Sequence, residues 1–371
     1  GKIEASLNNG KPVDGHAPGL TGKIMTKYIK AGISTDHECF TIEEAIEKLR
    51  QGMKILIREG SAAKNFNTLC PLIQEYPDSV MICTDDCHPD DLIKGHINNQ
   101  VKRSLKLGYD IFNVLQVASV NPVKHYNLNV GLLQPGDSAD FIVIDNINDL
   151  NVLANYIEGI NVLKSSNNSK RSEMNVSNYM FSASIQLEGL DLKAKTDKIK
   201  VIEVLEGELI TNILERKAKL KDGRVITDVE NDILKVVVVS RYKKEEFSVG
   251  FIKGFGLKKG AIAESIAHDS HHIIAVGVDD ESIFKSIDYI IKGKGGVCYY
   301  NGSNAIGLSL PVFGLMGFDS AQSIAKIYEG INANVIQDGC KLKAPFMTLS
   351  FMALTVIPKL KITPSGLFDV I

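Results

Sequence analysis

Between residues 1 and 128, short apolar runs alternate with longer segments whose apolar residues recur every three or four positions. The short runs predict buried strands, and the three-to-four spacing predicts helices. The expected strands are KPVDG (11–15), GIST (32–35), MKILIRE (53–59) and SVMICT (79–84). The expected helices between them cover residues 21–31, 41–52 and 62–77. Strands that alternate with helices in this way are typical of an α/β domain with a parallel sheet.

The pattern changes in the rest of the chain. Helical spacing continues through residues 99–108 and 110–127, and then GLLQPGDSADFIVID (131–145) takes a strand-like period after a Pro-Gly turn. Residues 161–180 are rich in serine and asparagine, which favours an exposed connection. β-Rich and helix-like stretches then alternate, which indicates a further domain with its own core. We therefore expect three parts: residues 1–128, 129–184 and 185–371.

Polar side chains of metal-ligand type follow each of the first four expected strands. His16 follows the first strand, His37 and Glu38 the second, Glu59 the third and Asp85 the fourth. In a (β/α)₈ barrel the active site is built at the carboxyl ends of the strands, so this spacing places them on one rim. Imidazoles with a carboxylate suit zinc, iron or manganese, and such an ion can acidify water near neutral pH. The pattern therefore predicts a hydrolytic metal site.

Each of these residues also has a structural interpretation. A single loop histidine is more often an ordinary hydrogen-bonding residue, although repetition at successive strand ends favours the metal site. Asp85 and Asp86 precede an apolar segment and could cap a helix, but Asp85 is the better ligand and proton-transfer candidate. Glu59 could instead pair with Arg58 or cap the next helix.

A short motif marks the start of the helix expected over residues 41–52. Thr41 and Glu44 form a capping-box pattern at the start of this expected helix. This pattern places His37 and Glu38 in the loop that joins a strand to a helix.

Composition narrows the class of partner. Lys plus Arg (42) nearly balances Asp plus Glu (44), so the chain lacks the broad positive charge expected for binding nucleic acid or an anionic membrane. A small molecule is the better fit.

The six cysteines are scattered, which favours a reducing cytoplasm. Cys83, Cys87 and His88 lack the second cysteine pair of a structural zinc site. The apolar runs are too short to span a membrane, and a soluble protein is expected.

The motifs, taken in order, resemble those of bacterial adenine deaminase, a family of the amidohydrolase superfamily. In the first half the resemblance lies in VDGHAPGL, AGISTDHE, LIREGSAAKN, CTDDCHPDDL, NPVKHYNL and GLLQPGDSADFIVID. In the second half it lies in VGFIKGFGLKKGAIAESIAHDSHHIIAVG, LSLPVFGLMG and PFMTLSFMALTVIPKLKITPSGLFDV. The resemblance implies a metal-dependent (β/α)₈ amidohydrolase barrel, of which only the later strands are present, a small β-sandwich segment and an α+β C-terminal domain.

The resemblance also implies a reaction, the hydrolysis of adenine to hypoxanthine and ammonia in purine metabolism. It implies that His16 and His37 are metal ligands, and that Asp85 contacts the metal and handles the proton. Glu38 is a candidate proton donor to the purine ring, or a carboxylate that orients His37. Glu59 is a candidate substrate-binding residue. The implied cofactor is a divalent metal, manganese or iron with zinc as an alternative, with two ions in the complete enzyme. A cytoplasmic homo-oligomer is expected.

One loop of the second half could extend this site. SIAHDSHHIIAVG carries several histidines ahead of an apolar strand, and His268 and His271 are the preferred pair for closing the adenine pocket or binding another ion. The alternative is a polar turn that precedes a strand.

The sequence departs from the superfamily pattern in three features. The His-x-His pair of the first barrel strand and the bridging carboxylate of the fourth are absent, and the resemblance begins just before the fifth strand. We therefore expect this chain to be inactive unless another segment supplies that half of the site. Cys87 also replaces the arginine that is common in the family's Asp-Asp-x-His-Pro motif.

Two other functions fit the sequence. The chain could be an amidohydrolase that acts on another purine or a cyclic amide, or a non-catalytic remnant of the fold. Cytidine-type zinc deaminases are excluded, because the chain has no H-x-E motif followed by P-C-x-x-C.

Overall fold

The computed structural model describes residues 1–61, 63–164 and 184–370, which form two compact units. The described residues of the first unit are 1–61, 63–87 and 94–164. The second unit contains the second half together with the short segment His88–Ile93. Most of the connection expected over residues 161–180 lies outside the described residues.

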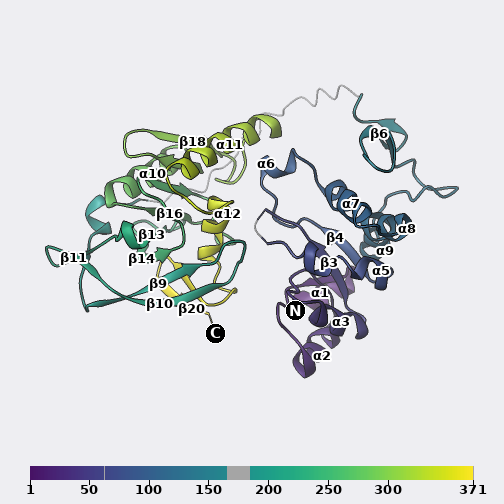
Figure 1. Ribbon diagram of the computed structural model, residues 1–371, viewed down its shortest axis with the longest axis horizontal. Helices are drawn as coiled ribbons and strands as arrows, with labels where there is room; N and C mark the ends of the chain where they lie inside the picture. Colours follow the sequence, from purple (N-terminus) through teal and green to yellow (C-terminus); the bar gives the residue numbers. More distant parts are fainter. Residues whose placement is uncertain (62, 165–183, 371) are drawn as a thin grey trace. The chain divides into compact units, whose positions relative to one another are not determined.

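The first unit is built on a four-stranded parallel sheet in the order β1-β2-β3-β4 (Figure 1). Its strands are β1 (Val13–Gly15), β2 (Ile33–Asp36), β3 (Lys54–Arg58) and β4 (Val80–Cys83). All four predicted strands are therefore confirmed. The strands run side by side without a closed barrel among the described residues, so all four carboxyl ends lie at one edge of the sheet.

Short helices precede, connect and follow these strands. They are α1 (Lys2–Asn8), α2 (Gly22–Lys30), α3 (Ile42–Arg50), α4 (Phe66–Leu69), α5 (Leu72–Glu75), α7 (Ile97–Lys106), α8 (Ile111–Leu115), the π-helical η1 (Gln116–Val120) and α9 (Asn121–Tyr126). The single helix predicted over 62–77 is wrong, because it is divided into α4 and α5 at Pro71. Proline has no N–H to donate to the preceding turn, which interrupts the helix.

The apolar side of these helices closes over the sheet. Ile55 and Ile57 of β3 and Val80 of β4 are fully buried, together with Phe66 and Leu69 of α4. This core fixes the strands, and therefore the residues at their ends, without help from the site itself.

A three-stranded antiparallel sheet follows the helices of the first unit. Its strands are β5 (Phe141–Ile144), β6 (Val152–Ile157) and β7 (Ile160–Asn161), in the order β5-β6-β7. The strand-like period predicted within residues 131–145 is confirmed by β5. Residues 131–140 are irregular and are held by the Asp140 and Asp137 carboxylates, which accept backbone N–H groups.

The second unit contains an eight-stranded mixed sheet in the order β10-β9-β14-β13-β16-β15-β17-β18. Its strands are β9 (Lys198–Val204), β10 (Thr211–Lys217), β13 (Ile233–Val239), β14 (Phe247–Lys253), β15 (Ala261–Glu264), β16 (Ile273–Gly277), β17 (Gly296–Tyr300) and β18 (Ala305–Ser309). Every residue of β13 is buried, including Lys235, the one charged residue in its otherwise apolar sequence. Smaller sheets are formed by β8 (Leu192–Lys193), β11 (Lys219–Lys221) and β12 (Arg224–Ile226), and by β19 (Leu360–Thr363) and β20 (Gly366–Asp369).

The second unit also contains helices and 3₁₀ turns. They are α6 (Pro89–Leu92), α10 (Asp280–Lys292), α11 (Ala321–Gln337) and α12 (Pro345–Ser350), with the 3₁₀ turns η2 (Leu187–Leu190), η3 (Val229–Asn231) and η4 (Phe351–Ala353). The α10 helix packs on β15, β16 and β17, and the short α6 packs on α11 (Figure 1). The His88 and Tyr328 rings meet edge to face, with centroids 4.8 Å apart. No described helix is long and apolar enough to cross a membrane.

A buried lysine in the second unit makes its stability depend on pH. Lys361 of β19 is fully buried, and its ammonium donates a hydrogen bond to the Leu209 carbonyl at 2.8 Å. Burial lowers the pKa of Lys361 to about 7. Lysine in an unfolded chain has a pKa of about 10.4. Between about pH 7 and that value the unfolded state therefore binds more protons than the folded state, and the free energy of unfolding rises with pH.

We expect Lys361→Met to raise the urea midpoint more at pH 6.5 than at pH 9.5, because the substitution removes a desolvation cost that exists only while the amine is charged. The exposed Lys359 of the same segment provides the control Lys359→Met. Equal changes at both pH values for Lys361→Met would contradict a lowered pKa.

Candidate metal centre

The end of β1 places His16 through a close backbone approach. A Cβ atom at Gly15 would lie 2.4 Å from both Ile33 Cγ2 and the Tyr28 hydroxyl, so glycine is required there. The Tyr28 hydroxyl accepts a hydrogen bond from the His16 N–H at 3.1 Å and lies 3.3 Å from the His16 carbonyl, to which it can donate. Tyr28 of α2 therefore holds the backbone of His16, whose side chain is 72% exposed.

The ends of β1 and β2 bring two histidines and a carboxylate together. The His16 and His37 rings are 4.6 Å apart at their centroids and nearly perpendicular. Glu38 Oε2 lies 3.3 Å from His16 Nδ1. Donor atoms of His16, His37 and Glu38 all lie within 4.8 Å of one another. Glu38 therefore joins the predicted ligand group, and it pairs with His16 rather than with the neighbouring His37.

Asp85, after β4, lies on the other side of His37. Its Oδ2 is 3.2 Å from His37 Nε2 and 2.5 Å from Arg58 Nη1. The His37 imidazole and the Arg58 guanidinium lower the pKa of Asp85 to about 2, so the carboxyl is ionised at neutral pH. Asp85 has a left-handed backbone (φ 55°), a conformation that aspartate tolerates better than most residues. Asp85 lies outside the group of three whose donor atoms all lie within 4.8 Å of one another.

The buried His37 nitrogen supports a cation site at this point. His37 is 13% exposed, and its Nε2 is buried without a hydrogen-bond partner among the described residues, although a carboxylate oxygen lies close by. His16 directs Nδ1 at a carboxylate, which leaves Nε2 for a metal, and this is the usual arrangement of a metal-binding histidine. Imidazole nitrogens with carboxylate oxygens suit a divalent transition metal. These residues therefore fit the ion that the pattern predicts.

Glu59 has a different partner from those considered from sequence. Its carboxylate forms a close ion pair with Arg103 of α7, and its N–H donates to the Cys83 carbonyl at 3.1 Å. Among the described residues it pairs with neither Arg58 nor a helix N-terminus. A substrate-binding role for Glu59 stays a prediction, and it would require the Arg103 pair to open or to be shared.

His268 and His271 lie in the second unit. His268 Nε2 is 2.7 Å from Asp269 Oδ1, and its ring packs against Phe351 with centroids 4.9 Å apart. The His271 carbonyl accepts a hydrogen bond from the Arg241 guanidinium at 3.1 Å. The two histidines therefore have different surroundings, and their role in an adenine pocket stays a prediction.

Sequence reasoning missed two residues of the centre, Arg58 and Asn65. Arg58 is the last residue of β3 and is 4% exposed, and its guanidinium lies between the carboxylates of Asp85 and Glu38, 3.6 Å from the latter. The Asn65 side chain accepts the Arg58 N–H at 2.7 Å and donates to the His37 carbonyl at 3.2 Å. A charged residue that ends an otherwise apolar strand was the signal available for Arg58.

Other candidate metal ligands form a second cluster behind the site. Atoms of Asp36, Cys39 and Glu44 also lie within 4.8 Å of one another. The Lys48 ammonium contacts all three, so a permanent internal cation neutralises this group. Burial raises the pKa of the Cys39 thiol, which makes it a poor metal ligand. Cys83, Cys87 and His88 do not form a metal-binding group among the described residues.

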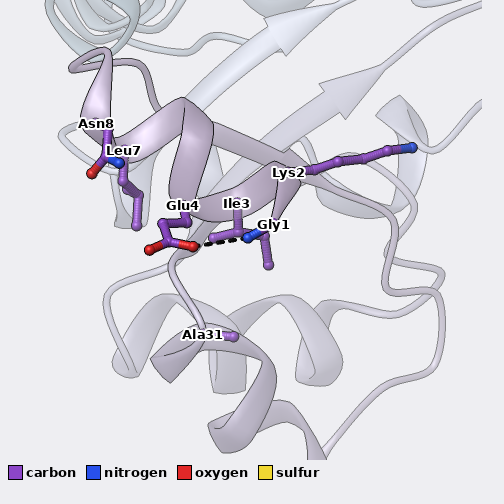
Figure 2. Close-up of a pocket in the computed structure, with 7 residues that line it drawn as sticks. All are labelled: Gly1, Lys2, Ile3, Glu4, Leu7, Asn8 and Ala31. Atoms are coloured by element: carbon purple, nitrogen blue, oxygen red, sulfur yellow. Dashed lines mark hydrogen bonds and ion pairs between the residues drawn. The ribbon is translucent and has the colours of Figure 1, made fainter.

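A shallow pocket lies beside α1, where Figure 2 shows its lining residues as sticks. It is lined by Gly1, Lys2, Ile3, Glu4, Leu7, Asn8 and Ala31. The amino group of Gly1 pairs with Glu4 at 2.9 Å. The lining contains no imidazole or thiol and none of the predicted site residues, so the candidate site is the histidine group instead.

The His16–Glu38 pair predicts how the metal-free protein responds to pH. Hydrogen bonding to Glu38 raises the pKa of His16, whereas burial lowers the pKa of His125. The pair therefore stabilises the fold below about pH 6.5, and this contribution is lost as pH rises through the raised pKa. Protons also compete with a metal for His16, so metal affinity falls as pH falls.

We expect histidine NMR titration of the metal-free protein to give His16 a higher pKa than His125. Glu38→Gln should lower the pKa of His16 and leave that of His125 unchanged. A His16 pKa at or below that of His125 would contradict the geometry of this pair.

Comparison with known proteins identifies related families for both halves of the chain. Residues 2–183 match the amidohydrolase family, and residues 208–371 match the adenine deaminase C-terminal domain. Adenine deaminase of Methanosarcina mazei is 47% identical over all of this chain and 69% of its own length. The adenine deaminases of Sulfurovum sp. and Borreliella burgdorferi are 48% and 45% identical, over 97% and 100% of this chain and 66% and 69% of their own lengths.

The parallel sheet, the histidines at its strand ends and the match of the first half together define an amidohydrolase, a class whose members generally bind divalent metals. The whole-chain identity and the match of the second half define the group within that class. The chain belongs to the adenine deaminase family.

Proposed function

We propose that this protein hydrolyses adenine to hypoxanthine and ammonia with the help of a divalent cation held by His16 and His37, with the carboxylates of Glu38 and Asp85 beside it. The convergence of His16, His37 and Glu38 at the ends of neighbouring parallel strands carries the proposal. The names of relatives that are 45–48% identical indicate adenine as the substrate. Manganese or iron is the proposed metal, with zinc as the alternative, and the complete enzyme is proposed to bind two ions.

The bound cation would acidify a water molecule near neutral pH. The residues of the chain provide the rest of the chemistry. Asp85 is ionised because its pKa is about 2, so its carboxylate is available to accept the proton of the attacking water. Protonated Asp85 would then be positioned to pass that proton to the departing amine. The atoms balance: water adds at the amine-bearing carbon, and ammonia leaves.

Arg58 and Glu38 support this transfer. Arg58 holds Asp85 Oδ2 at 2.5 Å, which fixes the carboxylate for a proton relay. Glu38 pairs with His16 Nδ1, which supports a role in setting the orientation of that ring. Proton donation by Glu38 to a purine ring nitrogen is proposed as a second role. Closure of the adenine pocket by His268 and His271 is proposed on the position of their loop before β16 alone.

The finer fold assignment is part of the proposal. The four parallel strands are proposed to belong to a (β/α)₈ barrel that includes residues 1–128. Residues 129–184 are proposed to form a β-sandwich segment and linker, and residues 185–371 the C-terminal domain. The family match of residues 208–371 supports the last assignment. We further propose a cytoplasmic homo-oligomer that acts in purine metabolism.

An assay of the complete gene product, stripped of metal and reconstituted with Mn²⁺, Fe²⁺ or Zn²⁺, tests this function. We expect release of ammonia from adenine with equal formation of hypoxanthine, and little turnover of guanine, cytosine or a cyclic amide. Preference for another heterocycle would indicate an amidohydrolase of different specificity. Folded protein that binds metal and turns over none of these compounds would contradict an enzymatic role.

A further inference from the structure

The ammonium of Lys48 lies at the centre of a buried polar network below the two histidines. Lys48 is the seventh residue of α3 and is fully buried. Its Nζ lies 2.7 Å from Asp36 Oδ2, 2.6 Å from Glu44 Oε1 and 2.6 Å from the Ala17 carbonyl oxygen. All three N–H donors of the ammonium are therefore used, and one of them reaches the residue that follows His16.

Asp36 connects the same ammonium to the other histidine loop. Asp36 is the last residue of β2 and is fully buried. Its Oδ1 accepts the N–H of Ala17 and the N–H of Glu38, each at 3.1 Å. A single carboxylate oxygen therefore fixes the backbone immediately after His16 and immediately after His37.

Glu44 makes a parallel connection one turn earlier on α3. Its Oε1 accepts the Gly19 N–H at 2.8 Å, and its Oε2 accepts the Phe40 N–H at 3.1 Å. Gly19 lies in the loop that follows His16, and Phe40 lies in the loop that follows Glu38. Two carboxylates bridge the two histidine-bearing loops, and Lys48 bridges the two carboxylates.

Fold stability gives little reason to retain these charges. Replacing a buried ion pair with apolar residues of similar volume is often neutral or stabilising, because desolvation offsets the attraction between the charges. The network instead determines geometry, because its bonds to Ala17, Gly19, Glu38 and Phe40 end on the backbone of the two loops that carry the histidines. Residues that orient metal ligands typically change metal affinity by about 10–100-fold when they are replaced.

We propose that Lys48 is a positioning residue: together with Asp36 and Glu44 it locks the two loops so that the His16 and His37 rings face one cation. The inference rests on the proposed function for the identity of the site, but it concerns metal binding, which can be measured without substrate.

Binding of Mn²⁺ alone, followed by the EPR signal of the free ion, tests the role of Lys48 in the complete gene product. We expect Lys48→Met to weaken Mn²⁺ binding by about 10–100-fold, because the ligand-bearing loops lose their shared anchor. Arg50→Met, which removes an exposed cation from the same helix, should leave Mn²⁺ binding unchanged. Folded Lys48→Met protein with the affinity of the parent would overturn the proposal.

Lys48→Met leaves the carboxylates of Asp36 and Glu44 buried without their cation, and this could prevent folding. A second measurement therefore uses the unaltered protein. The shared Asp36 oxygen predicts that the Ala17 and Glu38 amide protons exchange slowly and with similar protection factors in metal-free protein. Rapid or unequal exchange of these two amides would overturn the proposal. Parent protein that binds Mn²⁺ but does not deaminate adenine would contradict the proposed function and leave the role of Lys48 in place.

Discussion

Asp85→Asn is expected to lower kcat for adenine deamination by about 10²–10⁴-fold, the usual contribution of a positioned proton-transfer group. Asparagine keeps the shape of the side chain and accepts the left-handed backbone of residue 85 (φ 55°), so the substitution removes mainly the charge. The Arg58 guanidinium and the His37 ring would lose their anionic partner. KM should change little, because the lost interaction belongs to the transition state.

Steady-state kinetics and metal analysis of the same preparations measure this effect. The matched control is Asp78→Asn, which removes an exposed carboxylate that accepts a hydrogen bond from Gln116. A kcat for Asp85→Asn within about threefold of the parent, a change of only ~0.6 kcal/mol in the barrier, would show that another group transfers the proton. Loss of metal together with loss of activity would instead identify Asp85 as a ligand.

His37→Ala is expected to have the second large effect, the loss of bound metal. His37 is less exposed than His16, the other histidine of the site. Its Nε2 is buried without a hydrogen-bond partner among the described residues. Groups that merely orient a ligand contribute about 10–100-fold to metal affinity, so removal of a ligand should exceed that range. Deamination should fall in proportion to the metal that is lost.

Metal content after dialysis, measured by mass spectrometry, tests the role of His37. His125→Ala provides the control, because His125 is also a partly buried histidine of the first unit, but it lies against Ser34 instead of the site. Retention of the metal by His37→Ala would contradict the site. Loss of the metal from both variants would point to a general effect of histidine removal on the fold.

The sequence allowed the sheet and the ends of its strands to be predicted, because both follow from local patterns. A buried parallel strand is a short apolar run, and the polar residue after it is visible in the sequence, as with His16 and His37. The break in the helix at Pro71 could also have been foreseen, since a proline cannot donate to the preceding turn. The strands and the polar residues at their ends could therefore be predicted without knowledge of tertiary contacts.

The sequence did not allow us to predict which ion pairs and hydrogen bonds the charged side chains form. Thr41 caps α3 as predicted, with its hydroxyl accepting the Glu44 N–H at 3.2 Å. The Glu44 side chain, however, accepts from Phe40 N–H and binds Lys48 instead of returning to Thr41. Nothing in the spacing of Lys48 marks it as buried, because a lysine on an amphipathic helix is usually exposed. A pair between Arg58 and Glu59 was one of the alternatives open from sequence, whereas in the fold Arg58 pairs with Asp85 and Glu59 with Arg103.

The packing of α6 on α11 has a consequence for protein engineering. Tyr328 of α11 is 3% exposed, and the rings of His88 and Phe346 cover it. A fragment that begins near residue 185 would keep the eight-stranded sheet but would lack α6, and it would expose an aromatic surface to solvent. Such fragments should therefore self-associate, and joining residues 88–93 to them through a flexible linker is the modification most suited to keeping them monomeric.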